Sequence, residues 1–371
     1  MPTSQNVLES VIAQFEIPAA LDKAEGFGSG LINDTYLCEF NAGTETRKYI
    51  LQRINASVFR NPVEVMENVV TVTEHMQARL RREGVSDPLS VTPALVRTRN
   101  GRSFFRDSTN GYWRMFHFIE EGDVFDTVMS LDHAREVGRG LGRFQTLVSD
   151  LDPAKLHDTL PGFHHTPKYL AEYDNALRLD IKGRAKDAAA ETAFVSRRRA
   201  LAPLLTDLMA SGRLPLRVVH NDPKVNNVMI HRATHEALCM LDLDTVKSGL
   251  VHFDFGDCVR SAANPLGEDA VEPEKVRFDQ GLFEAVAGGY LREATFLTAG
   301  EIEMLPPSIK VITFELGLRF LADHLRGDTY FRTNYPGHNL HRARVQFKLL
   351  ESIEAAAERI TSFILTNRAR A

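Results

Sequence analysis

Apolar side chains recur at helical spacing in two stretches near the start of the chain. Residues 5–15 carry apolar side chains at positions 7, 8, 11, 12 and 15 among mostly polar ones, and residues 63–83 carry them at positions 63, 66, 69, 70, 72 and 76 with charged ones between. Recurrence every three or four residues predicts an amphipathic helix in each stretch. Between them, residues 26–55 form two β-leaning segments joined by a polar, glycine-containing turn, which predicts a hairpin.

Short apolar runs separated by turn residues continue up to residue 119. Runs at 95–98, 102–105 and 112–119 have Asn100-Gly101 and Asn110-Gly111 between them. Asn-Gly pairs favour tight turns, so these runs predict antiparallel strands.

The spacing changes after residue 122. Val137, Leu141, Phe144 and Val148 repeat at four, three and four residues, and helical patterns continue to residue 365. Glycines at 138, 140 and 142 weaken a helix, so we expect another helix to approach closely there. A chain of 371 residues is long for one core. We therefore predict an N-terminal lobe at 1–115, a hinge at 116–122 and a helical C-terminal lobe at 123–371.

Composition narrows the class of partner. The chain has 49 acidic and 44 basic residues and a net charge of −5, so no global basic field favours nucleic acid or acidic lipid. No apolar run is long enough to span a membrane, and the first residues lack a signal-peptide pattern. We expect a cytoplasmic protein with a small-molecule partner. Cys38, Cys239 and Cys258 lack metal or redox spacing, which predicts reduced structural thiols.

Three acidic motifs lie close together between residues 216 and 257. A short apolar strand at 217–219 leads into His220-Asn221-Asp222, and Asn227 follows Asp222 by five positions. Two short strands at 228–230 and 238–241, around a turn at 231–237, would return the chain so that Asp242 lies beside Asn227.

These residue types suit phosphoryl transfer. The reaction needs an acceptor hydroxyl held in line and oxygen ligands for magnesium at the nucleotide phosphates. Asp222 would accept the hydroxyl proton, and Asn227 and Asp242 would bind the metal. A single Asp or Asn is more often a turn residue. The joint spacing of all three favours the catalytic interpretation.

This order resembles the aminoglycoside phosphotransferase and choline kinase superfamily. The chain is more similar still to bacterial N-acetylhexosamine 1-kinases, in YILQR at Tyr49, LRVVHNDPKVNN at Leu216, LDLDT at Leu241 and FDFGD at Phe253. The segments at 315–331 and 335–340 are also similar. The resemblance implies an α+β, bilobal protein-kinase-like fold, with an antiparallel-sheet N-lobe that binds nucleotide and a mainly helical C-lobe that binds substrate.

The resemblance also implies roles for individual residues. Asp222 is the base, Asn227 and Asp242 are the Mg²⁺ ligands, and Thr245, Arg319 and Tyr330 are sugar contacts. Two alternatives stay open. Arg319 is spaced for a helix-surface ion pair with Glu315 or Asp323, and Tyr330 suits a packing role.

The nucleotide side carries weaker signals. Gly28 and Gly30 would let backbone amides approach phosphates, although G-x-G-x-G also suits an ordinary hairpin. Arg53 follows a β-leaning run where a phosphate-binding cation is expected, and simple exposure is the alternative. Ile119 lies in the predicted hinge, where backbone groups would bind adenine. ATP is the family expectation, and GTP is not excluded.

Two further features bear on specificity and on metal binding. The related kinases have a histidine where this chain has Leu31, so selectivity for N-acetylated sugars does not transfer automatically. His252, Asp254 and Asp257 lack the pattern of a zinc site, and we expect Asp254 to support the catalytic loop.

The leading hypothesis is an ATP-dependent kinase acting on the C1 hydroxyl of an N-acetylhexosamine or related hexose. A kinase of another small alcohol, such as choline, homoserine or an aminoglycoside, is the first alternative, and a non-catalytic nucleotide- or sugar-binding regulator is the second. The sequence does not indicate the oligomeric state.

Overall fold

The computed structural model describes residues 4–28, 32–43 and 45–368. Its chain forms two compact units. The first unit contains the residues up to Gly122 together with 154–160 and 241–247, and the second contains 123–153, 161–240 and the residues from Ser248 onward. The sequence prediction had placed both inserted segments, 154–160 and 241–247, in the helical C-terminal lobe.

The first unit is built on a five-stranded antiparallel sheet in the order β1-β2-β3-β5-β4. The predicted hairpin is confirmed as the β2–β3 pair. The first strand of the sheet was not predicted, because most of its side chains are exposed and show no alternation. The strands are β1 (Ala20–Gly26), β2 (Asp34–Asn41), β3 (Thr46–Ile54), β4 (Phe105–Arg106) and β5 (Tyr112–His117).

Two of the three strands predicted between residues 95 and 119 were largely wrong. The run at 95–98 forms only single-residue bridges, from Leu95 to Phe116 and from Thr98 to Phe15. The run at 102–105 contributes only the start of the two-residue strand β4. Thr98 accepts the Arg102 amide and donates to Asn100, so a side-chain-stabilised turn replaces strand pairing. The third run is confirmed as β5.

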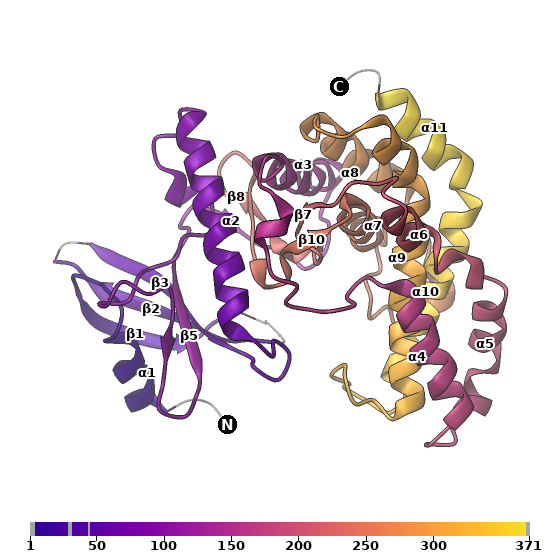
Figure 1. Cartoon of the computed structure of the whole chain (residues 1–371), viewed down its shortest axis with the longest axis horizontal. Helices are drawn as coiled ribbons and strands as arrows, with labels where there is room; N and C mark the ends of the chain where they lie inside the picture. The colour runs from indigo at the N-terminus through magenta and orange to yellow at the C-terminus, as the bar shows by residue number, and fades with distance from the viewer. Residues whose placement is uncertain (1–3, 29–31, 44, 369–371) are drawn as a thin grey trace. The chain divides into compact units, whose positions relative to one another are not determined.

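Helices α1 (Gln5–Ile12) and α2 (Pro62–Arg82) confirm the two predicted helices and contact opposite faces of this sheet (Figure 1). The α1 face carries an apolar core, with Leu51, Trp113 and Met115 packed against the α1 side chains. The α2 face carries the alternate residues of the same strands, including Gln52 and Arg114, and the Arg114 guanidinium lies 3.9 Å from the Met66 sulfur of α2.

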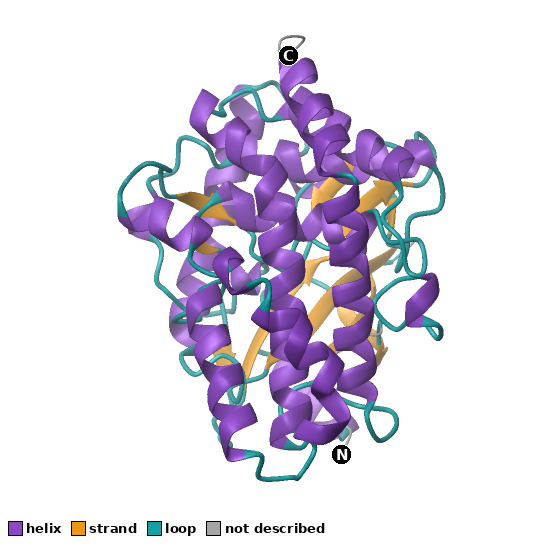
Figure 2. Ribbon diagram, turned by 90° about the vertical axis from the view of Figure 1, so that its right-hand side faces the viewer, coloured by secondary structure: helices purple, strands orange, loops and turns teal. Residues whose placement is uncertain are grey.

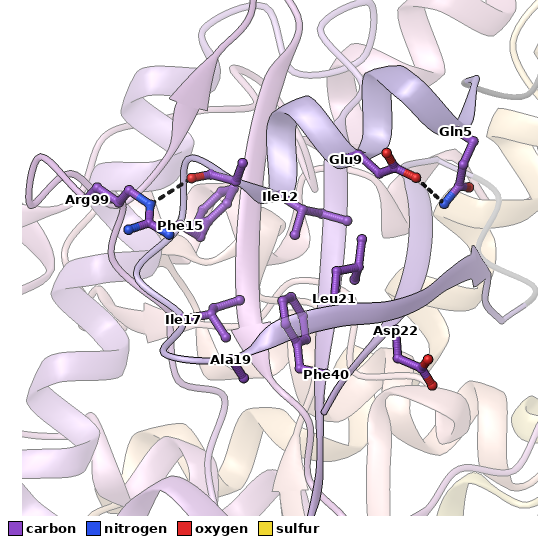
Figure 3. Close-up of a pocket in the computed structure, with 11 residues that line it drawn as sticks. Gln5, Glu9, Ile12, Phe15, Ile17, Ala19, Leu21, Asp22, Phe40 and Arg99 are labelled. Atoms are coloured by element: carbon purple, nitrogen blue, oxygen red, sulfur yellow. Dashed lines mark hydrogen bonds between the residues drawn. The ribbon is translucent and has the colours of Figure 1, made fainter. Parts of the chain in front are cut away.

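A pocket of about 470 Å³ lies on the α1 face, between α1 and the first two strands (Figure 3). Ile12, Phe15 and Phe40 contribute apolar side chains to a lining that also includes polar ones. At its rim Gln5 donates to Glu9, and Arg99 donates to the Ala13 carbonyl. These polar groups are therefore engaged within the protein.

The second unit is mainly helical, as predicted (Figure 2). Its longest helix, α9, packs against α4, α7 and α10. Among the described residues, no helix is long and apolar enough to cross a membrane. The helices are α3 (Leu131–Leu147), α4 (Thr166–Leu179), α5 (Ala189–Ser196), α6 (Leu204–Ala210), α7 (Val251–Ala262), α8 (Gln280–Glu293), α9 (Ala299–Arg326), α10 (His338–Ala355) and α11 (Ala357–Arg368).

Short strands interrupt the helices and carry the loops described below. β7 pairs with β10, and β8 pairs with β9. Their bounds, with the short β6 at the boundary of the units, are β6 (Gly122–Asp123), β7 (Arg217–Val219), β8 (Val228–His231), β9 (Ala237–Met240) and β10 (Lys247–Gly249). Cys38, Cys239 and Cys258 are buried free thiols, as expected.

The glycines of α3 confirm the predicted close helix contact. A Cβ added at Gly138 would lie 2.0 Å from the Val286 carbonyl oxygen of α8, and one at Gly142 would lie 2.8 Å from the Tyr290 carbonyl oxygen. The contact is reciprocal, since a Cβ at Gly289 of α8 would lie 2.1 Å from the Arg135 carbonyl oxygen. These helices cross at a distance that only glycine permits.

Candidate active site

The loop after β7 brings Asp222 and Asn227 into contact. The Asn227 Nδ2 donates to the Asp222 carbonyl oxygen at 2.7 Å and to its Oδ2 at 3.1 Å. Because the amide nitrogen faces Asp222, the amide oxygen of Asn227 points away from it and is the kind of hard donor that magnesium binds. Two residues predicted from the sequence are thus assembled on one loop.

Lys224 completes this cluster and was missed by the sequence analysis. Its Nζ lies 2.9 Å from the Asp222 Oδ2, and both side chains are partly exposed. The available signal was its position, two residues after Asp222 on the same short loop. A lysine there places a positive charge next to the proposed base, where phosphate oxygens would also be stabilised.

A buried carboxylate fixes the backbone of this loop, as expected for Asp254. Its Oδ2 accepts the His220 amide at 2.8 Å, and its Oδ1 accepts the Asn221 amide at 2.7 Å. Gln145 donates to Oδ2 at 2.8 Å and is held in turn by the Tyr290 hydroxyl at 2.6 Å. Burial raises the pKa of Asp254, while these hydrogen bonds and the nearby His220 oppose the rise.

The hairpin predicted after Asn227 is confirmed. Val228 of β8 pairs with Met240 of β9. Asn227 directly precedes Val228, and Asp242 follows Met240 by two residues, so both predicted metal ligands adjoin one cross-strand pair along the chain.

In the first unit, buried contacts hold the segment that contains Asp242. Asp244 forms a salt bridge with Arg114, in which the two side chains are 1% and 2% exposed. Asn33 donates to the Asp244 Oδ2 at 2.7 Å. Asp242 itself is exposed and has a left-handed backbone, with φ of 56°. Thr245, the residue after Asp244, is half-buried.

The structure separates Arg53 from this segment. Arg53 pairs across the sheet with Trp113, and its guanidinium carbon lies 5.6 Å from the tryptophan ring centre on the α1 face. Asp244 and Arg114 lie on the α2 face, so Arg53 and residues 241–247 are on opposite faces of one sheet. The role of Arg53 at the phosphates stays a prediction.

The other residues predicted for nucleotide binding are placed unevenly. Gly28 has φ of 75°, which favours glycine. Ile119 is buried, and Gly30 and Leu31 lie outside the described residues. The α2 face also carries a strip of half-buried apolar side chains, which the sequence analysis did not predict. They are Leu37, Ile50 and Phe116, cross-strand neighbours in adjacent strands.

In the second unit, Arg319 lies among aromatic rings. Its guanidinium carbon is 5.2 Å from the ring centres of Phe163 and Tyr169 and 5.4 Å from that of Phe331. Burial lowers the pKa of Arg319, but Tyr169, Tyr330 and the nearby Glu315 together raise it. Within the described residues it forms no salt bridge with Glu315 or Asp323, which rules out the surface ion pair considered above.

Tyr330 is presented by a loop that Asp323 organises. The Asp323 carboxylate accepts the backbone amides of Thr329, Tyr330 and Phe331, each at 2.9 Å. The Tyr330 side chain is 68% exposed, so it is not a core packing residue. The structure thus gathers Arg319 and Tyr330, two of the three predicted sugar contacts.

The His252, Asp254 and Asp257 group has other partners. His252 bonds the Glu301 carbonyl at 2.8 Å, and Asp257 pairs with Arg260 at 2.8 Å. In the described part of the chain, no group of three His, Cys, Asp or Glu side chains could hold a metal ion.

The antiparallel-sheet unit and the mainly helical unit define the predicted class, an α+β protein with a protein-kinase-like fold. Residues 23–296 match the model of the phosphotransferase enzyme family (APH). The chain belongs to that family.

Solved structures share the fold over nearly the whole chain. A microcompartment-associated aminopropanol kinase is 17% identical with a TM-score of 0.60, covering 98% of this chain and 99% of its own. Choline kinase from Cryptosporidium parvum Iowa II is 13% identical with a TM-score of 0.60, covering 98% and 100%. Spectinomycin phosphotransferase, solved with ADP and spectinomycin, is 11% identical with a TM-score of 0.59, covering 97% and 100%.

Proposed function

We propose that the protein is a magnesium-dependent kinase that transfers the γ-phosphate of ATP to the C1 hydroxyl of an N-acetylhexosamine or related hexose. The product is a sugar 1-phosphate. The observation that carries the proposal is the cluster of Asp222, Lys224 and Asn227 on the loop that follows β7. Membership of a phosphotransferase family supports the reaction type.

In the proposed reaction, Asp222 accepts a hydrogen bond from the sugar hydroxyl and takes its proton as the new bond forms. The hydroxyl oxygen bonds to the γ-phosphorus, the bond from that phosphorus to the β-phosphate oxygen breaks, and ADP leaves. Lys224 stabilises the negative charge on the transferred group. When bound, magnesium supplies further charge neutralisation at the phosphates, and Asn227 and Asp242 would hold it.

For the nucleotide, we propose that the adenine ring packs on the apolar strip of the α2 face. Leu37, Ile50 and Phe116 are half-buried there, on the same face as the Arg114–Asp244 pair. An apolar wall beside backbone groups of the predicted hinge suits a purine. ATP is proposed on the family resemblance.

Arg319 favours a neutral acceptor over an aminated one. Choline, aminopropanol and aminoglycosides carry positive charge, which a guanidinium repels. A sugar offers hydroxyl and carbonyl oxygens, which accept hydrogen bonds from arginine and from a tyrosine hydroxyl. The exposed Tyr330 and the half-buried Arg319 therefore support a sugar.

A phosphorus-NMR screen of purified protein with ATP, Mg²⁺ and a panel of hexoses, amino alcohols and aminoglycosides tests the proposal. We expect a sugar 1-phosphate signal, and comparison of N-acetylated with plain hexoses shows what Leu31 does to selectivity. Asp222→Asn should keep nucleotide affinity while kcat falls about 100-fold or more. Unchanged turnover in that variant would refute the mechanism. Transfer to no acceptor would favour a non-catalytic regulator.

A further inference from the structure

We propose that His164 and Glu315 form a positioning pair that holds the Asn221 carbonyl and thereby sets the place of Asp222 for phosphate transfer. The inference rests on the proposed function and adds two residues to it. The His164 Nε2 lies 3.0 Å from the Asn221 carbonyl oxygen, and its Nδ1 lies 2.8 Å from the Glu315 Oε1. These residues are 57 and 151 positions away from His164 in the chain.

The chemistry of the two groups decides which of them donates the hydrogen bond between His164 and Asn221. A backbone carbonyl can only accept, so the Nε2 of His164 must carry a hydrogen. The other oxygen of Glu315 accepts the Thr166 hydroxyl at 2.6 Å, which fixes the carboxyl group. Burial lowers the pKa of His164, but the Glu315 carboxylate and both hydrogen bonds together raise it. His164 therefore acts as a donor toward the loop.

Both residues of this contact, His164 and Asn221, have an unusual backbone conformation. Asn221 has φ of 66° and His164 has φ of 58°, both in the left-handed region. Non-glycine residues adopt this region rarely and persist there when the surrounding structure holds them. Asn221 directly precedes Asp222, so its carbonyl is part of the peptide group that orients the proposed base. Asp254 holds the amide side of this turn, and His164 holds the carbonyl side.

Helix α9 links this support to the acceptor residues. Glu315, Arg319 and Asp323 are spaced by four residues, so they lie on one face of the helix in successive turns. Each serves a different group: Glu315 holds His164, Arg319 lies among aromatic rings, and Asp323 holds the loop of Tyr330. Phe163, which contacts Arg319, is the neighbour of His164. The acceptor side and the catalytic loop therefore share one rigid element.

Variants at His164 and Glu315 separate positioning from general stability. His164→Asn suits the left-handed backbone but is too short to reach Asn221. Glu315→Gln keeps a hydrogen-bonding partner for His164 and removes only the charge. Glu191→Gln is the matched control, since Glu191 is also buried in the second unit but pairs with Arg344 at 2.7 Å. All are first checked for unchanged melting temperature and nucleotide affinity.

We expect His164→Asn to lower kcat at least about tenfold with little change in the nucleotide KM, because small misplacements of a reacting group reduce rates by up to about a hundredfold. Glu315→Gln should retain most of the rate, and Glu191→Gln all of it. The inference is overturned if folded His164→Asn keeps wild-type kcat, or if Glu191→Gln lowers kcat as much. If His164→Asn does not fold, Glu315→Ala takes its place, because it leaves the histidine backbone intact. We then expect a lower kcat in Glu315→Ala, and wild-type kcat in that folded variant overturns the inference.

Hydrogen exchange of the amides of residues 217–222 and Lys224, measured without substrate, distinguishes this inference from the proposed function. Faster exchange in His164→Asn than in the control supports the contact, even if the wild-type protein phosphorylates none of the tested acceptors. Unchanged exchange overturns it, even if the wild-type protein is an active sugar kinase.

Discussion

Individual residues acquire their roles here through contacts that their own chemistry does not reveal. Asp222 is one of many carboxylates, yet its side chain accepts a hydrogen bond from Asn227 and forms an ion pair with Lys224. Asp107 is also a loop carboxylate, but its contacts are structural. It accepts the Trp113 indole N–H at 2.7 Å, the Thr109 amide at 2.8 Å and the Gly111 amide at 2.8 Å.

The Asp107 contacts predict a pH-dependent contribution to stability. Burial raises the pKa of Asp107, but its hydrogen bonds to Trp113, Thr109 and Gly111 outweigh that and lower it from 3.8 to about 2. A depressed folded-state pKa stabilises the protein above the unfolded value, and this contribution disappears as the pH falls toward about 2. Asp107→Asn should therefore be destabilised near neutral pH.

The single tryptophan allows a local measurement of this effect. Denaturant unfolding followed by Trp113 fluorescence should show a constant difference between wild type and Asp107→Asn above pH 5. We expect the difference to shrink between pH 4 and pH 2. A difference that stays constant over that range would show that the carboxylate is not stabilised by these bonds.

Between elements, close approach of backbones decides the packing of α3 on α8. Gly138 and Gly289 face the opposite helix at distances where a methyl group has no room. The alternating glycines of α3 therefore reflect a helix crossing in the second unit, whereas their effect on an isolated helix would be only destabilising.

Gly138→Ala should lower the stability of the helical unit. The added methyl group meets backbone atoms of Val286 that cannot move like a flexible side chain, and overpacking of this kind destabilises by about 1 to 3 kcal/mol. Gly300→Ala is the control, because its Cβ would meet nothing within 4 Å in α9. Thermal unfolding should show a lower melting temperature for the first variant and an equal or higher one for the second. Equal melting temperatures in both would contradict the crossing.

For the molecule as a whole, the chain assembles its first unit from three separate segments. Residues 241–247 leave the second unit after β9, join the first, and return to the second at Ser248. The buried Arg114–Asp244 pair and the hydrogen bond from Asn68 to the Val246 carbonyl attach this segment to the first unit. Attachment of residues 241–247 therefore depends on long-range polar contacts.

The Arg114–Asp244 pair should behave as a buried ion pair whose partners depend on each other. Arg114→Met or Asp244→Leu alone leaves an unpaired buried charge and should destabilise the first unit by about 3 to 5 kcal/mol. The double variant removes both charges and should lose much less than the sum. Unfolding followed by Trp113 fluorescence measures this cycle. Additive losses would show that the two charges are not coupled.

Sequence alone determined the local parts of this protein. Helical spacing predicted α1, α2 and the helical second unit, and the two apolar runs after Asn227 predicted the β8–β9 hairpin. The exposed strand β1 escaped it, because it lacks the alternation of a half-buried strand, whereas the strand predicted at 95–98 forms only single-residue bridges.

Only the tertiary structure decided the long-range contacts. His164 meets Glu315 across 151 residues, and Arg114 meets Asp244 across 130. It also placed Arg53 on the sheet face opposite residues 241–247. Spacing along one chain carries no information about such pairs, since their partners are chosen by the packing of whole elements. A short sequence motif was therefore enough to predict the type of chemistry, whereas the long-range contacts that hold this motif in place could be seen only in the fold.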